Sequence, residues 1–500
     1  MVLKKVRGKM TRLTFYGGVN EIGGNKILLE DDGTRIFLDF GMSFGKREEF
    51  FEEYLMPRTS NALGDFIEMG LVPNLKGIYR TDLVRLLGRE PKPPVINAVF
   101  LSHAHADHVN YISFLHEDVP LYCGHTALLI LQSLNESKTR TIESEILDFM
   151  KRPRTRRRGE PPVVRKVKTF RTGDKIKIGS LFVEPVHVDH SVPGAYGFIV
   201  HTRKGAVAYT GDLRLHGRRS QMTRDFIEKA QKSRPIALIC EGTRFREKHR
   251  KEEKEGEEEV RKECLKEVKK TRGLVIADFN FKDVDRVKTF YTIARETKRK
   301  MVVHLLDVFL LKYLSQDPAL DLPQPDDPNI LIFLPKRQSG TYREDDYQRA
   351  ERQFYHYPNT VTAKNLDQEK VLLCFSYWKI KELIDIQPLS GSLFIHSLSE
   401  PFNEEMAMAY QRLKNWIDHY RLKFFQSHCS GHASEKELKE IIKKINPRKL
   451  FFIHIQPPQK KYLVPLDQEE AEKFRTMVRK EFESADRQVI IPEYGKTYEL

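Results

Sequence analysis

The sequence has little cysteine and no long apolar run, and both features narrow the class of protein. It holds five cysteines in 500 residues, and no two of them form a CxxC pair. This argues against a disulfide framework and against a zinc site built from thiolates. No run is long enough to span a bilayer and no early apolar stretch precedes a cleavage site, so we expect a cytoplasmic protein. Because one core rarely serves a chain of this length, we expect two or more domains.

The chain is strongly basic, with a formal net charge of +15. Such an excess favours a polyanionic partner, although abundant Lys, Arg and Glu are also typical of thermophile surfaces. The densest basic run is KRPRTRRR at 151–158, which contains no acid and which we interpret as a loop. The alternatives for this run are phosphate contacts or a solvated loop. The residues predicted to contact phosphate there are Arg156, Arg157 and Arg158, and a second basic cluster, also suited to phosphate, comprises Arg214, Arg218, Arg219 and Arg224.

Short apolar runs rich in β-branched residues repeatedly end in a polar or ligand-type residue. Runs of this kind precede Asp39, His103, Asp212, Glu241 and His454. Between them lie stretches with a helical pattern at 128–151, 282–297 and 404–422. This alternation predicts an α/β fold with functional residues at the C-terminal ends of strands.

The stretch FLSHAHADHVN at 100–110 places three histidines and an aspartate in six positions directly after an apolar run. Imidazole and carboxylate groups are the usual ligands of zinc and manganese. His103 and His105 project to the same side of an extended backbone, whereas the adjacent Asp107 and His108 suit a chain that has begun to turn. The pattern therefore predicts a site for two metals, with a polar loop of solvated histidines as the alternative.

Further ligands must come from later in the chain. The segment EPVHVDHSVPGAYGF offers His190, just before a turn, with His187 as a competitor. In AYTGDLRLHG, Asp212 follows a glycine at the end of an apolar strand. A carboxylate can bridge two cations through its two oxygens, so Asp212 suits a shared ligand.

Taken in order, these motifs resemble the metallo-β-lactamase superfamily, in which an aspartate ending an early strand, HxHxDH, a later histidine and a later aspartate recur. CEGTRF at 240–245, SHCSGHASEKEL at 427–438 and KLFFIHIQP at 449–457 resemble the opening, closing and last motifs of the β-CASP nucleases. HSLSEP at 396–401 is similar to the GSQGEP run of ribonuclease J. The chain thus resembles the β-CASP nucleases, and archaeal ribonuclease J among them.

The resemblance implies a role for each of these residues. Two divalent ions, Zn²⁺ or Mn²⁺, would share Asp212, and Glu241 would orient His432 as a general acid. Asp39 would accept a hydrogen bond from a ligand histidine, with a simple strand-end turn residue as the alternative. The serines of two motifs, Ser397 and Ser430, would contact RNA. The implied ligands of one ion are His103, His105 and His190, and those of the other are Asp107, His108 and His454.

The resemblance also implies the architecture and the activity. Residues 10–243 and 421–500 should form a metallo-β-lactamase αββα sandwich, with 244–420 as an inserted β-CASP α/β domain. The expected activity is metal-dependent hydrolysis of RNA, by 5′–3′ exonuclease or endonuclease action, in a protein that dimerises as its relatives do. The alternatives are a DNA nuclease of the same group, a small-ester or thioester hydrolase, and an inactive scaffold that binds RNA. The inserted domain, the basic charge and the complete ligand set favour the ribonuclease.

Overall fold

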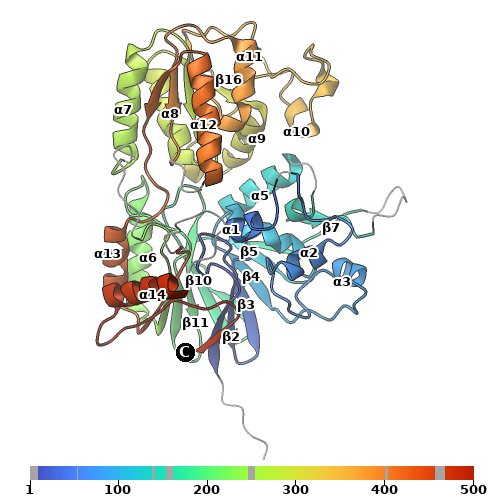
Figure 1. Cartoon of the computed structure of the whole chain (residues 1–500), viewed down its shortest axis with the longest axis vertical. Helices are drawn as coiled ribbons and strands as arrows, with labels where there is room; N and C mark the ends of the chain where they lie inside the picture. The colour runs from blue at the N-terminus through green and yellow to red at the C-terminus, as the bar shows by residue number, and fades with distance from the viewer. Residues whose placement is uncertain are drawn as a thin grey trace, which may run out of the picture.

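A computed structural model shows two units, one above the other in Figure 1. The structure describes residues 10–52, 54–137, 141–153, 161–245, 254–399, 404–456 and 468–500. The lower unit, here called the two-sheet unit, holds two seven-stranded sheets, and the upper one, the third-sheet unit, holds a third sheet of seven strands.

Both sheets of the two-sheet unit combine early strands with strands from the end of the described chain. In the first sheet, β1 to β3 run antiparallel and β3, β4, β5 and β8 run parallel. Its order is β23 (Thr497–Glu499), β1 (Thr11–Phe15), β2 (Ile27–Asp31), β3 (Thr34–Leu38), β4 (Ala98–Leu101), β5 (Leu121–Gly124) and β8 (Val167–Phe170). The order of the second is β22 (Gln488–Ile490), β21 (Lys449–Ile453), β13 (Ala237–Glu241), β12 (Ala206–Tyr209), β11 (Tyr196–His201), β10 (Leu181–His187) and β9 (Ile176–Ile178).

The two sheets face each other across an apolar core and carry helices on their outer faces. Phe15, Phe100, Phe198 and Phe451, from both sheets, are fully buried in this shared core. The outer face of the second sheet is covered by α6 (Ser220–Lys232), α13 (Glu435–Ile445) and α14 (Gln468–Phe482). The first sheet is covered by α2 (Leu63–Glu68), α3 (Thr81–Leu86), α4 (Ala106–Val109) and α5 (His125–Ser137). The short helix α1 (Phe44–Glu48) has no buried residue. The predicted α/β fold with an αββα sandwich is confirmed.

The third-sheet unit is a wholly parallel sheet with helices on both faces, so its central strands are buried and almost continuously apolar, whereas the edge strands are partly exposed. Its order is β17 (Thr360–Val361), β16 (Ile330–Phe333), β15 (Lys300–His304), β18 (Val371–Cys374), β14 (Val275–Asp278), β19 (Leu393–His396) and β20 (Lys423–Gln426). One face packs against α7 (Glu257–Lys270), α8 (Val284–Glu296) and α9 (Leu305–Leu314). The other packs against α11 (Leu383–Ile386) and α12 (Glu404–His419); α10 (Arg349–Arg352) lies beside α9.

Two sequence expectations differ from the structure in their bounds. The helix expected over 128–151 ends at Ser137, and Asp148–Phe149 forms β6 instead, because it pairs with β7 (Val163–Val164). The division expected at 420/421 precedes β20, which pairs with β19 in the third sheet. The exact domain limits stay a prediction.

All five cysteines are buried and unpaired, with no disulfide between them. Among the described residues, no helix is long and apolar enough to cross a membrane.

Candidate metal centre

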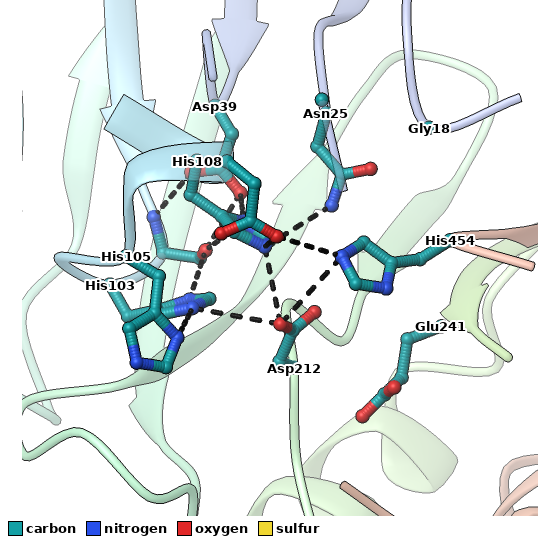
Figure 2. Close-up of polar contacts among 12 residues, drawn as sticks. Gly18, Asn25, Asp39, His103, His105, His108, Asp212, Glu241 and His454 are labelled. Atoms are coloured by element: carbon teal, nitrogen blue, oxygen red, sulfur yellow. Dashed lines mark hydrogen bonds and ion pairs between the residues drawn. The ribbon is translucent and has the colours of Figure 1, made fainter. Parts of the chain in front are cut away.

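Strand ends from both sheets of the two-sheet unit deliver the predicted side chains to one place (Figure 2). His103 and His105 follow β4, and Asp107 and His108 lie in the short helix α4. The other members follow or end further strands: Asp39 after β3, His190 after β10, Asp212 after β12, Glu241 at the end of β13, His432 after β20 and His454 after β21. The pairing of β21 with β13 brings His454 into the second sheet. His454 can therefore lie beside Asp107, which precedes it by 347 positions.

The predicted ligand atoms form two groups that share Asp212. Within each group, one candidate ligand atom per residue lies within 4.8 Å of the others. The groups are His103, His105, His190 and Asp212, and Asp107, His108, Asp212 and His454. A third group, of Asp212, Glu241 and His432, lies beside them.

In the first group, three imidazole nitrogens converge. His105 Nδ1 lies 3.1 Å from both His103 Nε2 and His190 Nε2. His190 Nδ1 lies 2.6 Å from the carbonyl oxygen of Gly431, which can only accept, so Nδ1 carries the proton. The lone pair of a neutral His190 is then on Nε2, directed at the other two histidines. This is how an imidazole is presented to a cation.

In the second group, the histidines are oriented in the same way. His108 Nδ1 lies 2.7 Å from Asp39 Oδ2, and this leaves Nε2 to face Asp212 at 3.2 Å and Asp107 at 3.6 Å. His454 Nδ1 lies 2.7 Å from the Thr243 hydroxyl, and its Nε2 lies 3.2 Å from Asp107 Oδ2. The Nε2 atoms of both rings thus face carboxylate oxygens, an arrangement that a positive charge between them, from a proton or a metal ion, would stabilise.

Two further observations fit a bound cation. Asp212 Oδ1 is buried and has no hydrogen-bond partner among the described residues, and a buried orphan acceptor is costly. Burial lowers the pKa of His105 to about 4, so at neutral pH its ring is uncharged and able to ligate. The donor set of imidazoles and carboxylates suits zinc or manganese. The His and Asp cluster can therefore hold metal.

Asp39 sits behind the histidines and is fully buried. Its carboxylate accepts hydrogen bonds from the Ser102 backbone N–H at 2.6 Å, the Ser102 hydroxyl at 2.7 Å and the Tyr209 hydroxyl at 2.6 Å, in addition to facing His108. Four partners on one carboxylate fix the His108 ring and its tautomer. This contact matches the one expected of Asp39.

Glu241 lies on the other side of Asp212, where it contacts His432 directly and His454 through the Thr243 hydroxyl. Its carboxylate, 1% exposed, accepts from the Leu213 N–H at 2.8 Å and from the Thr243 hydroxyl at 2.5 Å, and lies 2.9 Å from His432 Nδ1. Burial acts to lower the pKa of His432, but the Glu241 carboxylate and then Asp212 and Asp107 outweigh it and raise that pKa to about 9. His432 is thus protonated at neutral pH, and its Nε2 is the nitrogen not held by Glu241.

The backbone around the cluster is packed tightly enough to require particular residues. A Cβ at Gly41 would lie 1.7 Å from the Asp107 carbonyl oxygen, so only glycine fits beside the HxHxDH loop. His454 adopts a left-handed conformation, with φ of 52°, and its N–H donates to the Gly18 carbonyl at 2.8 Å. Unfavourable backbone of this kind in a non-glycine residue is typical of functional sites.

The other predicted residues fall outside the cluster. His187 turns away, with Nδ1 2.8 Å from Thr172 and its ring against Tyr196, so of the two competing histidines His190 joins the candidate ligands. Ser397 is 1% exposed and its hydroxyl is held between Arg286 and the Ser427 carbonyl, whereas Ser430 is half-buried near His432. Their contact with RNA stays a prediction. Arg156, Arg157 and Arg158 lie outside the described residues.

Sequence reasoning missed the residues that orient the predicted ones. Thr243 links Glu241 to His454, and Ser102 links Asp39 to His103, whose Nδ1 lies 3.0 Å from the Ser102 hydroxyl. Each is the neighbour of a predicted residue in a strand-end motif, and this proximity is the signal that the sequence offers. The sequence predicts that Arg214 contacts phosphate, but its side chain is fully buried and bound to protein groups.

Two families match parts of the chain. The β-lactamase superfamily domain matches residues 80–251, and the Zn-dependent metallo-hydrolase RNA specificity domain matches residues 419–466. The first contains most of the predicted ligands and the second contains His432 and His454.

Similar proteins are found over nearly the whole chain. Ribonuclease J of Pyrococcus abyssi is 24% identical over 461 residues, which cover 89% of this chain and 90% of that protein. Ribonuclease J of Mycoplasma pneumoniae is 23% identical over 462 residues, covering 89% and 68%. A crystal structure of a protein of unknown function from Enterococcus faecalis matches with a TM-score of 0.70 and 24% identity, over 98% of this chain and 100% of that one. The predicted resemblance to the metallo-β-lactamase superfamily and to ribonuclease J is confirmed.

Proposed function

We propose that this protein is a metal-dependent ribonuclease of the ribonuclease J type, which hydrolyses phosphodiester bonds of RNA. The observation that carries the proposal is a protonated histidine, His432, held by Glu241 directly beside the His and Asp cluster. Hydrolysis of a small ester does not need this pair, whereas a ribose oxygen leaving phosphorus is a poor leaving group and needs a proton. The similarity to ribonuclease J over 89% of the chain supports the same conclusion.

Each group of residues has its own part in the proposed reaction. We infer two ions, Zn²⁺ or Mn²⁺, one held by the His103, His105 and His190 group and one by the Asp107, His108 and His454 group, with Asp212 shared. When bound, such ions neutralise phosphate charge and lower the pKa of a water that attacks it. Asp39 and Thr243 keep the His108 and His454 rings in position. His432, protonated because of Glu241, donates the proton from Nε2 to the departing oxygen.

The proposal is tested with end-labelled RNA. Purified protein should cleave single-stranded RNA, lose this activity in a chelator and recover it on addition of Zn²⁺ or Mn²⁺. Asp212→Asn serves as the control for contaminating nucleases, because it removes the shared ligand and should be inactive. Cleavage of single-stranded DNA of the same sequence at an equal rate would contradict the choice of RNA.

The same assay addresses the finer expectations. Paired substrates carrying a 5′-monophosphate or a 5′-triphosphate distinguish 5′–3′ exonuclease action from internal cleavage, through the release of mononucleotides or of longer fragments. Light scattering of the full chain tests the expected homodimer. A cytoplasmic location also stays a prediction.

A further inference from the structure

A buried arginine lies behind the candidate site and is used by none of the steps above. Arg214 follows Asp212 by two residues and is fully buried, and its guanidinium donates hydrogen bonds to three acceptors. Nε binds Asp189 Oδ1 at 3.1 Å, Nη2 binds Asp285 Oδ2 at 2.9 Å, and Nη1 binds the Ser430 carbonyl oxygen at 3.1 Å. A fixed fork that reaches three acceptors at once is specific to arginine.

Two of the three contacts lead directly to histidines of the site. Asp189 precedes His190, and Ser430 lies two residues before His432. The segments meet again where His190 Nδ1 lies 2.6 Å from the Gly431 carbonyl oxygen. Arg214 therefore closes a ring of contacts, and a shift of the 430–432 segment would move His432 and the support of His190 together.

The third contact crosses to the other unit. Asp285 lies in the first turn of α8, in the third-sheet unit, and is 4% exposed. Near it Arg218 also crosses, donating to the Thr289 hydroxyl on the same helix at 2.9 Å, but this contact does not involve the 430–432 segment. Of these two hydrogen bonds to α8, only the one that Asp285 accepts connects the helix, through Arg214, with the 430–432 segment of the site.

The packing around Arg214 leaves it no freedom. A Cβ at Gly217 would lie 2.3 Å from Arg214 Nε and 2.4 Å from Asp189 Oδ2, so the loop after Arg214 must have glycine there. Asp189 Oδ2, the oxygen that Arg214 does not bind, accepts the Arg219 backbone N–H at 3.0 Å. Arg214 and the Asp189 carboxylate are therefore fixed in position by their neighbours.

We propose that Arg214 is a positioning residue that makes the placement of His432 and His190 depend on the docking of α8. It touches no substrate and acts by holding the 430–432 segment against the cluster while Asp285 holds it from the third-sheet unit. If the third-sheet unit moved away, the hydrogen bond between Arg214 and Asp285 would break. His432, the general acid, would then be held less firmly in position. The proposal for cleavage rests on the proposed function, but the predicted link between Asp285 and the two histidines does not.

The matched variants are Asp285→Ala and Thr289→Val, one turn apart on α8, each of which removes one hydrogen bond between the units. Asp285→Ala should slow RNA cleavage by about tenfold to a hundredfold, the scale of a slightly misplaced catalytic group, and slow a nitrophenyl phosphodiester much less. Asp285→Asn, which keeps an acceptor oxygen, should retain most activity, and Thr289→Val should behave as wild type. In a His432→Ala background, Asp285→Ala should cause a much smaller additional loss on RNA than it causes in the wild-type protein, because the part that acts through His432 has already been removed.

A spectroscopic readout separates this proposal from the proposed function. In protein with isotope-labelled histidine, the imidazole signals of His432 and His190, assigned through His432→Ala and His190→Ala, should shift in Asp285→Ala and in Arg214→Lys but not in Thr289→Val. Unchanged signals in Asp285→Ala, or equal shifts in Thr289→Val, would overturn the positioning role even if RNA is cleaved. Shifts as expected in a protein that cleaves no RNA would uphold it and refute only the proposed function. Thermal unfolding of each variant verifies that it is folded.

Discussion

At the scale of single residues, the centre is made of side chains whose properties are set by their neighbours. His105 and His432 are both histidines of the same centre, yet burial holds the pKa of one at about 4 and the Glu241 carboxylate raises that of the other to about 9. The same residue type thus serves as a neutral candidate ligand in one group and as a candidate acid in the group beside it. The Glu241 carboxylate, which lies 2.9 Å from His432 Nδ1, contributes most to this difference in pKa, and Asp212 and Asp107 add to it.

Replacing His432 by Ala should separate proton donation from the other steps. Metal content and RNA affinity should stay near normal, while RNA cleavage slows by roughly a hundredfold to ten-thousandfold, as is typical for a lost general acid. A nitrophenyl phosphodiester, whose leaving group needs no proton, should be much less affected. Equal losses on both substrates would mean that His432 positions the substrate or the metals and is not the acid.

His190 and His187 form a matched pair for the metal assignment. His190→Ala should lower the bound metal, measured by elemental analysis, because its Nε2 converges with His103 and His105. His187→Ala should leave the metal content unchanged, since its Nδ1 is engaged by Thr172. The opposite result would show that the wrong histidine has been chosen.

At the scale of elements, an ion pair holds the start of the short helix α2. Asp65, in the first turn of α2, accepts from Arg58 through both its backbone N–H at 2.8 Å and its guanidinium. The bond from Arg58 holds the pKa of Asp65 at about 2, although burial acts in the opposite direction. A carboxylate with a depressed pKa stabilises the folded chain at pH values above its unfolded pKa, and this stabilisation is lost as the pH falls through the folded one.

Asp65→Asn should therefore lower the free energy of unfolding by about 1 kcal/mol at pH 7, a modest value because Arg58 is largely exposed and screened. The difference from wild type should be complete above about pH 4 and should vanish as the pH falls through about 2. Urea unfolding at several pH values measures it. Glu68→Gln, at an exposed position of the same helix, is the control. A difference that does not change with pH would contradict the argument.

Elements also show what the sequence could and could not predict. The HxHxDH loop was predictable because its four ligands follow one strand, so their spacing alone constrains their geometry. The residues alone left His187 and His190 as competitors, because the choice depends on which way the chain turns after β10, and only the family resemblance favoured His190. The prediction for Arg214 was wrong for a related reason: composition gives a positive charge but not its burial, and a buried arginine with protein partners has the same sequence signal as one that binds phosphate.

At the scale of the whole molecule, the net charge of +15 gives a prediction about binding. Each neutralised phosphate releases counterions, so RNA affinity should fall steeply with salt. Replacing Arg156, Arg157 and Arg158 by Glu should flatten the log–log slope by about 0.7 for each phosphate group that is no longer neutralised. Cleavage at saturating RNA should change little. Filter binding over a range of salt concentrations gives the slope, and an unaltered slope would show that 151–158 is a solvated loop.

The pairing of β21 with β13 also determines when the centre can form during synthesis of the chain. The chain lays down Glu241 at the end of β13 roughly two hundred residues before His454, and the whole third-sheet unit is synthesised in between. At the usual 5 to 20 residues per second, a ribosome needs about 10 to 40 s for that interval. For most of this interval the nascent chain contains the HxHxDH motif but neither His432 nor His454, so the centre is incomplete. A protein with the proposed ribonuclease activity would therefore lack its complete centre until the chain has been synthesised as far as His454.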